Sequence, residues 1–214
     1  MKKKSMQKKN LEKIYRVNGD ILSTLIASDE IGWGSVSELS IQRIIYISTV
    51  LFSFRYEDKK NPFEEDYDYS VSLRGPYSDI IPQSLNFLIV NDWVILSSEG
   101  CELSERNMPD MSRLPNYLER KEWIETIIYI LGIYGEEKIY DFVFRDPQYQ
   151  DNLQRNSIRE INTTSHNKTV QTLRKMKIAF EKALGESASE LDNKKYLNMY
   201  FDYVFSRILR GETD

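Results

Sequence analysis

The sequence predicts a mostly α-helical protein with a small β element near its middle. Two observations support this fold class. Apolar residues recur at helical spacing over most of the chain, whereas the stretch 67–103 alternates apolar and polar residues around glycine-rich turns. The 214 residues suffice for one large domain or two small ones. We expect an N-terminal domain over 11–106 that contains the β element and a helical C-terminal domain over 116–214.

The N-terminal part begins with a lysine-rich segment that two helices follow. Residues 1–10 contain no acid and no apolar pattern, so we expect a basic flexible arm. Helical spacing then runs from Leu11 to Ile26, and Asn18-Gly19 predicts a kink or a break. The next helix has Ser37 or Ser40 as its candidate N-cap. The lysines of the arm are Lys2, Lys3, Lys4, Lys8 and Lys9.

The stretch 67–103 has the outline of a winged helix. Alternation over 67–73 predicts a half-buried strand, which Gly75-Pro76 ends. Ser78 is the expected N-cap of the helix that follows. The segments "WVIL" and "CEL", joined by the turn "SSEG", predict a two-stranded wing. We therefore expect the N-terminal domain to be winged-helix-like.

The sequence predicts helices throughout the second half of the chain. The linker 104–115 holds two prolines and is the expected domain boundary. In the last helix, Tyr196, Tyr200 and Tyr203 share one flank of a wide apolar face. This face is either the surface of a central core helix or a surface that a partner subunit covers.

Composition narrows the class of protein. Lys+Arg 29 against Asp+Glu 33 gives a net charge of -4, so the chain is no generic nucleic-acid coat. Its single cysteine, Cys101, excludes an intramolecular disulfide and fits a reducing compartment. We find neither an apolar run of signal-peptide length after the basic start nor a membrane-length apolar window. We expect a cytoplasmic protein that makes no membrane contact.

Motifs for catalysis or cofactor binding do not occur in the sequence. One cysteine and one histidine cannot form a Cys/His zinc site, and the Walker A, GxGxxG and GxSxG patterns are absent. The acidic run "EEDYD" reads as a solvated loop in preference to a magnesium site. We therefore expect no enzyme activity, no cofactor and no metal. A degenerate enzyme that uses His166 or Asp66 is a remote alternative.

Local charge favours a protein partner over DNA for the winged helix. Residues 75–105 hold five acids and no lysine or arginine, a local charge of -5 that would repel phosphates. We interpret this region as a docking module; a hairpin with no direct role is the alternative. The candidate interface residues are Arg74, Tyr77, Asp79, Gln83 and Asn86, together with the three tyrosines of the last helix. The possible DNA contacts are the five lysines of the arm and Lys168, Arg174, Lys175 and Lys177.

The order of these elements resembles a known family. A helical lead-in, "LSIQRIIYISTVLFSF", a strand, "RGPYSDIIPQSLNFLIVNDWV" and a wing follow one another over residues 11–105. This order resembles the middle components of bacterial three-component ABC-ATPase conflict systems, including the small subunit of Lamassu-type anti-phage defence (LmuC-like). The "GPYS" motif, Gly75 to Ser78, is also similar to Panacea-type antitoxin domains. The chain differs from such an antitoxin in its long helical second half.

The resemblance implies a non-catalytic adaptor subunit. Such a subunit would bridge an SMC-like ATPase and an effector, often a nuclease, and would keep the effector inactive until the ATPase senses unusual DNA. This chain would then meet DNA only through the complex. The alternative is a winged-helix DNA-binding regulator or antitoxin, which would need the lysine-rich arm or the cations of 168–177 to contact phosphates.

Overall fold

The computed structural model of the protein describes residues 2–106, 108–155, 160–185 and 191–211, with the side chains of 2–9 and 184 left out. It is mostly helical and contains two short antiparallel hairpins, which confirms the expected fold class at that level. The helices are α1 (Lys2–Glu30), α2 (Glu38–Arg55), α3 (Ile80–Val90), α4 (Tyr117–Gly132), η1 (Glu136–Lys138), α5 (Ile139–Phe144), α6 (Pro147–Gln154), α7 (Lys168–Leu184) and α8 (Asn193–Leu209). The strands are β1 (Ser70–Ser72), β2 (Gly75–Tyr77), β3 (Val94–Leu96) and β4 (Cys101–Leu103).

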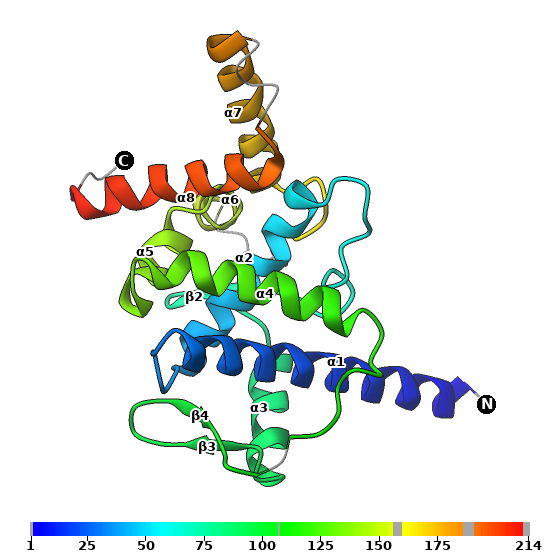
Figure 1. The fold of residues 1–214 in the computed structure, drawn as a ribbon. Helices are drawn as coiled ribbons and strands as arrows, with labels where there is room; N and C mark the ends of the chain where they lie inside the picture. The colour runs from blue at the N-terminus through cyan, green and yellow to red at the C-terminus, as the bar shows by residue number, and fades with distance from the viewer. Residues whose placement is uncertain (1, 107, 156–159, 186–190, 212–214) are drawn as a thin grey trace.

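Helix α1 is continuous, so the expected kink or break at Asn18-Gly19 is wrong. Gly19 faces α4, where a Cβ would come within 3.2 Å of the Tyr117 ring, so glycine allows the two helices to pack closely. Residues 2–10, expected to form a separate arm, belong to the same helix (Figure 1). The side chains of the five lysines lie outside the described residues.

Helix α2 is the centre of the fold. The side chain of Ser37 accepts a hydrogen bond from the Ser40 amide at 3.1 Å, which confirms Ser37 as the N-cap. Nearly every residue of α2 is buried, because α1, α4, α5, α7 and α8 all pack against it (Figure 1). One hydrophobic core therefore includes residues from both sides of the linker 104–115, and the segments 11–106 and 116–214 share it.

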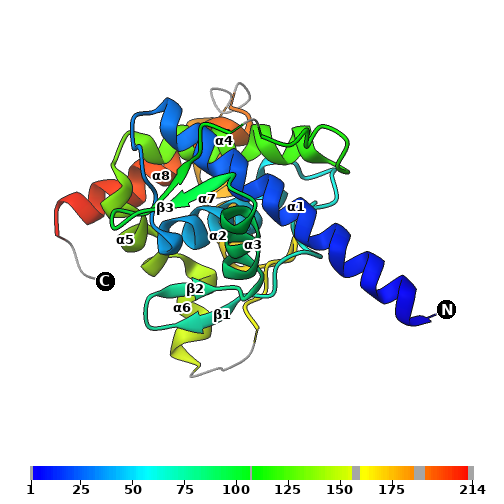
Figure 2. The same ribbon diagram turned by 90° about the horizontal axis from the view of Figure 1, so that it is seen from below.

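The first hairpin differs from its prediction. Strands β1 and β2 pair antiparallel, with Ser72 opposite Gly75 and a turn at Leu73-Arg74. Gly75 and Pro76 thus lie inside β2, and the expectation that they end the strand is wrong. The residue before α3 is Asp79 and not Ser78, and Asp79 makes no capping side-chain hydrogen bond. Figure 2 shows this hairpin beside α6, consistent with the packing of α6 on β1.

The second hairpin contains the two paired strands that the sequence predicts. Strands β3 and β4 pair antiparallel, with Ile95 opposite Glu102. Cys101 also exchanges two backbone hydrogen bonds with Val36, at 3.0 and 2.8 Å, which attaches the hairpin to the loop before α2. Figure 1 shows the hairpin beside α3 at the lower margin of the molecule, below α1.

The second half is helical, as expected. Only Arg145 and Asp146 separate α5 from α6, and the rest of the segment "RDPQYQD" forms the start of α6. Asp146 caps α6 by accepting a hydrogen bond from the Tyr149 amide at 2.9 Å. Helix α8 packs through Phe201 and Phe205 on Phe142 of α5, whereas α7 projects from the body. Among the described residues, none of the helices has both the length and the apolar character needed to cross a bilayer.

Candidate functional site

The strongest candidate site is a hollow at the β1–β2 turn. It has a volume of about 560 Å³ and is lined by Ser37, Glu38, Leu39, Ser72, Arg74 and Tyr77. Arg74 is exposed and Tyr77 is half-buried, so both interface candidates face the same hollow. Beside them, Leu73 is 99% exposed at the tip of the turn. Tyrosine and arginine are enriched among the residues that dominate protein interfaces, whereas a single exposed leucine is normal on a protein surface.

Helix α2 and its neighbours hold this hairpin in place. The Arg43 guanidinium donates to the Arg74 carbonyl at 2.7 Å and lies 4.8 Å from the Tyr140 ring centroid. Burial lowers the pKa of Arg43. The Tyr149 hydroxyl donates to the Ser72 carbonyl at 2.8 Å. Hydrogen bonds from α2 and α6 therefore fix both sides of the turn before any partner binds.

The residues that lead into α3 are equally well fixed. The Gln42 side chain donates to the Ser78 carbonyl at 3.1 Å and accepts from the Ser78 amide at 3.0 Å. The three polar candidates that follow, Asp79, Gln83 and Asn86, are exposed and lie along one flank of α3. Burial raises the pKa of Tyr77, and the carboxylates of Glu38 and Asp79 raise it further. Asp79, at the start of this flank, therefore lies close to Tyr77 of the hollow.

The tyrosines of α8 do not form an outward face. Tyr196 and Tyr200 are only 4% exposed, whereas Tyr203 is 51% exposed. Tyr200 packs edge-on against Phe142, and Tyr196 lies near Phe180 of α7. Tyr196 and Tyr200 belong to the core, so the shared interface flank was a wrong expectation; Tyr203 alone stays an interface candidate.

The cations of α7 are divided between contacts inside the protein and solvent. Lys177 donates to the Asn193 side chain at 2.8 Å, and Arg174 approaches the Glu57 carboxylate at 3.9 Å. Lys168 and Lys175 are exposed. The four candidate DNA contacts therefore do not form one continuous basic surface.

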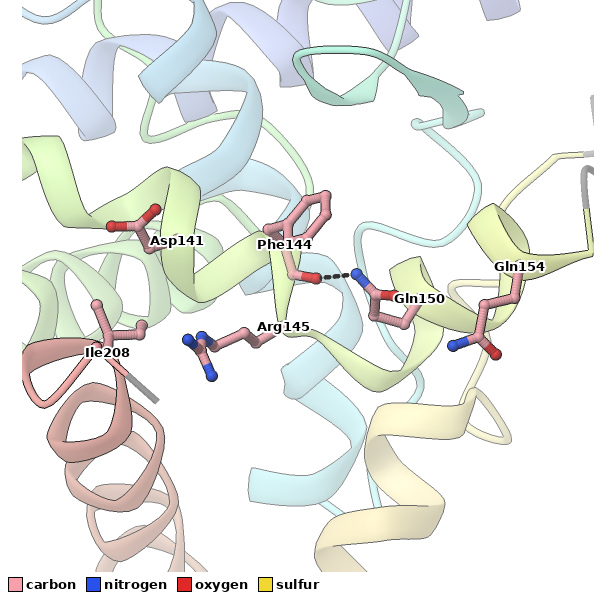
Figure 3. A pocket seen from close by; sticks show the side chains of 7 residues that line it. Asp141, Phe144, Arg145, Gln150, Gln154 and Ile208 are labelled. Carbon is pink, nitrogen blue, oxygen red and sulfur yellow. Dashed lines mark hydrogen bonds between the residues drawn. The ribbon is translucent and has the colours of Figure 1, made fainter. Parts of the chain in front are cut away.

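A wider groove lies where α5, α6 and the end of α8 meet (Figure 3). Its volume is about 800 Å³, and it is lined by Asp141, Phe144, Arg145, Gln150, Gln154, Ile208 and Gly211. Figure 3 shows the Gln150 amide donating to the Phe144 carbonyl. These lining residues include no nucleophile paired with a base. In the part of the chain that the structure describes, no three His, Cys, Asp or Glu side chains are grouped to hold a metal ion.

Sequence reasoning missed a buried ionic cluster. Arg120 of α4 donates to Asp20 of α1 and, at 2.9 Å, to Asp66. Arg16 donates two hydrogen bonds to Asp66, at 2.9 and 2.6 Å, and the Tyr67 hydroxyl donates to Asp20 at 2.5 Å. Burial raises the pKa of Asp20, while Arg120 opposes that shift. Because each carboxylate is paired with a guanidinium, the cluster joins α1, α4 and the loop before β1.

A signal for this cluster is present in the sequence. Arg120 lies three, four and seven residues before Trp123, Ile124 and Ile127, so it occupies the buried stripe of its helix. A charged residue in such a stripe requires a buried counter-charge. His166, the other residue considered for chemistry, is exposed before α7 and lies within hydrogen-bonding distance of Ser165.

Comparisons with protein-family models, with curated proteins and with solved structures found no match.

Proposed function

We propose that this protein is a non-catalytic adaptor that binds protein partners through a winged-helix-like module. The module consists of the β1–β2 turn, α3 and the β3–β4 hairpin. In line with the resemblance over 11–105, the partners are an SMC-like ATPase and an effector nuclease of an anti-phage defence complex. The adaptor bridges the two subunits in the cytoplasm and meets DNA only through the complex.

The observation that carries this proposal is the charge of the module. Its acids Asp79, Asp92, Glu99 and Glu105 are all exposed, and Glu102 is half-buried. Residues 75–105 contain no lysine or arginine, and the adjacent Arg106 pairs with one of these acids, Asp92, at 3.1 Å. A helix and a wing that read DNA must release counterions from phosphates, and carboxylates at this surface would repel them. A protein surface that carries basic residues is the better match.

The hollow at the β1–β2 turn supplies the apolar part of the same surface. Leu73 offers side-chain area, Tyr77 combines area with a hydroxyl, and Arg74 can pair in bidentate fashion with a carboxylate. Binding energy in protein interfaces is concentrated on a few such residues. Because hydrogen bonds already fix the hairpin, binding requires little further ordering of the backbone.

Co-expression with the proteins encoded by neighbouring genes tests the adaptor role. We expect the wild-type chain to co-purify with an ATPase and an effector, and Arg74→Glu to lower partner recovery about tenfold, which corresponds to ~1.4 kcal/mol. Arg113→Glu makes the same charge reversal on a side chain that is 91% exposed outside the module, and should leave recovery unchanged. A wild-type chain that stays monomeric and recovers no neighbour-encoded protein refutes the proposal.

A DNA-binding regulator is the second candidate, favoured by the exposed Lys168 and Lys175 on the projecting helix α7. It predicts that the isolated chain binds duplex DNA with an affinity that falls steeply as salt rises. Replacing both lysines with glutamate should then weaken binding and flatten the salt dependence. The absence of binding at low salt would exclude this role for the isolated chain.

A further inference from the structure

Strand β3 has an unpaired outer edge within the described residues. Strand β4 lies between β3 and the single bridge to Val36, so β3 is the edge strand. Within the described ranges, β4 is the sole strand that pairs with β3. Figure 1 shows the hairpin at the lower margin of the molecule, with β3 below β4 and no labelled helix below β3; α3 packs against β3.

The hydrogen bonds of the hairpin show which backbone groups face outward. The Ser97 amide donates to the Gly100 carbonyl at 2.8 Å, and the Ser104 amide donates to the Trp93 carbonyl at 3.1 Å. Hydrogen-bonded and non-hydrogen-bonded pairs alternate in an antiparallel ladder. The backbone N–H and C=O of Ile95 therefore also point toward β4, whereas those of Val94 and Leu96 do not.

The residue opposite Leu96 supports this assignment independently. Cys101 stands across from Leu96, yet its amide and carbonyl both bond to Val36 on the far side of β4. The backbone groups of Leu96 therefore point away from β4, as do those of Val94 two residues earlier. These four groups form a short row of donors and acceptors at the free edge.

The side chains of β3 do not protect this edge. Proteins guard edge strands by keeping them short or by placing lysine, proline or a bulge in them; β3 is short, at three residues, but its sequence, "VIL", contains neither lysine nor proline. Ile95 is 51% exposed, Leu96 is 63% exposed and the neighbouring Val90 is 72% exposed. An apolar edge left open in this way suits a second strand.

Charge identifies the kind of strand that fits. The segment 91–106 contains Asp92, Glu99, Glu102 and Glu105 against the single cation Arg106, and four acids less one cation leave a charge of -3. Arg106 pairs with Asp92 at 3.1 Å, so Glu99, Glu102 and Glu105 account for this net charge. A strand that carries lysine or arginine next to its apolar residues complements this edge.

We propose that β3 binds a protein partner by strand addition. The partner contributes an extended segment in which apolar and basic residues alternate, and its backbone pairs with Val94 and Leu96. This inference rests on the proposed adaptor role, because it names one contact of that partner surface. A second copy of the chain is disfavoured at this edge, since it would bring two sets of the same acids together. The phosphates of duplex DNA would be repelled by the same acids.

A peptide assay on the full chain tests the edge directly. The probe is a fluorescent peptide of about ten residues that alternates lysine and valine, a length typical of a strand; the control peptide has glutamate in place of lysine. We expect only the basic peptide to raise its anisotropy with the wild-type chain. We also expect it to slow amide hydrogen exchange in the segment 93–104, which a purely electrostatic contact would not do.

Two variants separate backbone pairing from side-chain contact. Leu96→Pro removes an outward amide that β4 does not use, so the hairpin should tolerate it, and peptide affinity should fall at least about tenfold, ~1.4 kcal/mol. Leu96→Ser keeps that amide and should retain more of the affinity.

A third variant, Glu99→Lys, tests the charge of the edge. It removes one acid at the turn and should weaken binding of the basic peptide without changing the backbone hydrogen bonds between β3 and β4. It serves as the test if Leu96→Pro does not fold.

Several outcomes would overturn strand addition. They are no binding by the wild-type chain, equal binding of the acidic peptide, affinity unchanged in Leu96→Pro, binding of duplex DNA at this edge, or self-association that Leu96→Pro abolishes. The adaptor role is judged separately by recovery of neighbour-encoded proteins. Peptide binding at β3 without such recovery refutes the adaptor role alone, whereas recovery that is insensitive to Leu96→Pro and Glu99→Lys refutes strand addition alone.

Discussion

Replacing Arg120 with methionine would remove the buried cation that Asp20 and Asp66 share. The side chains of all three residues are at most 2% exposed. Arg120 donates to Asp20 through two nitrogens and to Asp66 at 2.9 Å, and its guanidinium carbon lies 4.5 Å from the Phe63 ring centroid. Methionine keeps much of the apolar volume of the side chain, so the change is mainly electrostatic.

The free energy of unfolding should fall by about 3–5 kcal/mol at neutral pH, the usual cost of leaving buried charge uncompensated. Asp66 keeps the two hydrogen bonds from Arg16, at 2.9 and 2.6 Å. Asp20 loses both hydrogen bonds from Arg120 and keeps the one that the Tyr67 hydroxyl donates at 2.5 Å. Most of the loss should therefore come from Asp20. Since domains are usually stable by only about 5–15 kcal/mol, the variant would fold marginally.

The loss should also depend on pH. Burial raises the pKa of Asp20 and Arg120 opposes that shift, so removing Arg120 raises the pKa further. A carboxyl group with a raised folded-state pKa adds stability below its unfolded pKa, and that stability disappears as pH rises through the folded value. The variant should therefore differ from the wild type less in mildly acidic solution than at neutral pH.

Urea denaturation followed by far-UV circular dichroism at pH values near 5 and 7 measures both effects, and a midpoint shift at constant slope reports stability. Arg16→Met is the matched control; it should cost less, because Arg16 is 19% exposed and is not the sole partner of Asp66. Adding Asp20→Asn and Asp66→Asn to Arg120→Met should restore much of the stability. A loss below about 1 kcal/mol at neutral pH, or equal losses at both pH values, would refute the electrostatic explanation.

Three further predictions concern single positions. Gly100→Ala should lower the free energy of unfolding by about 1–3 kcal/mol in the same urea assay, because Gly100 has φ +151 and a Cβ would lie 2.7 Å from the Val36 backbone. Burial raises the pKa of Cys101 to about 11, so a colorimetric thiol reagent at mildly alkaline pH should label it only after unfolding. Asp146→Asn should lower the free energy of unfolding by about 1–3 kcal/mol in thermal melts. The two oxygens of Asp146 accept separately from Tyr46, at 2.8 Å, and Thr169, at 2.5 Å, and asparagine has only one side-chain oxygen.

The elements that the sequence predicted well are those whose signals are local. The cap at Ser37 and the turn of the β3–β4 hairpin depend on residues that are neighbours in the chain. The unbroken helix α1 could not be predicted, because Gly19 is accommodated by a contact with Tyr117 that is distant in sequence. Strand β2 was missed for the same reason: Gly75-Pro76 reads as a turn, and bonds from α2 hold it as a strand.

The candidate site was predicted in part. Apolar spacing in α3 left Asp79, Gln83 and Asn86 outside the buried stripe, and the structure exposes all three. For α8 the spacing was ambiguous, because a wide apolar face fits either a partner or several intramolecular neighbours. Packing decides it: Phe142 of α5 and Phe180 of α7 cover Tyr200 and Tyr196. No pattern within α8 carries that information.

Both parts of the proposed partner surface are tied to the same helix. Gln42 holds the backbone of Ser78 before α3, Arg43 holds the carbonyl of Arg74, and Val36, just before α2, holds Cys101 of β4. Helix α2 is in turn buried among α1, α4, α5, α7 and α8. The turn at Arg74 and the edge of β3 are therefore positioned by one buried element. A partner that contacts both would meet a preformed surface, so little of its binding energy would be lost to ordering this chain.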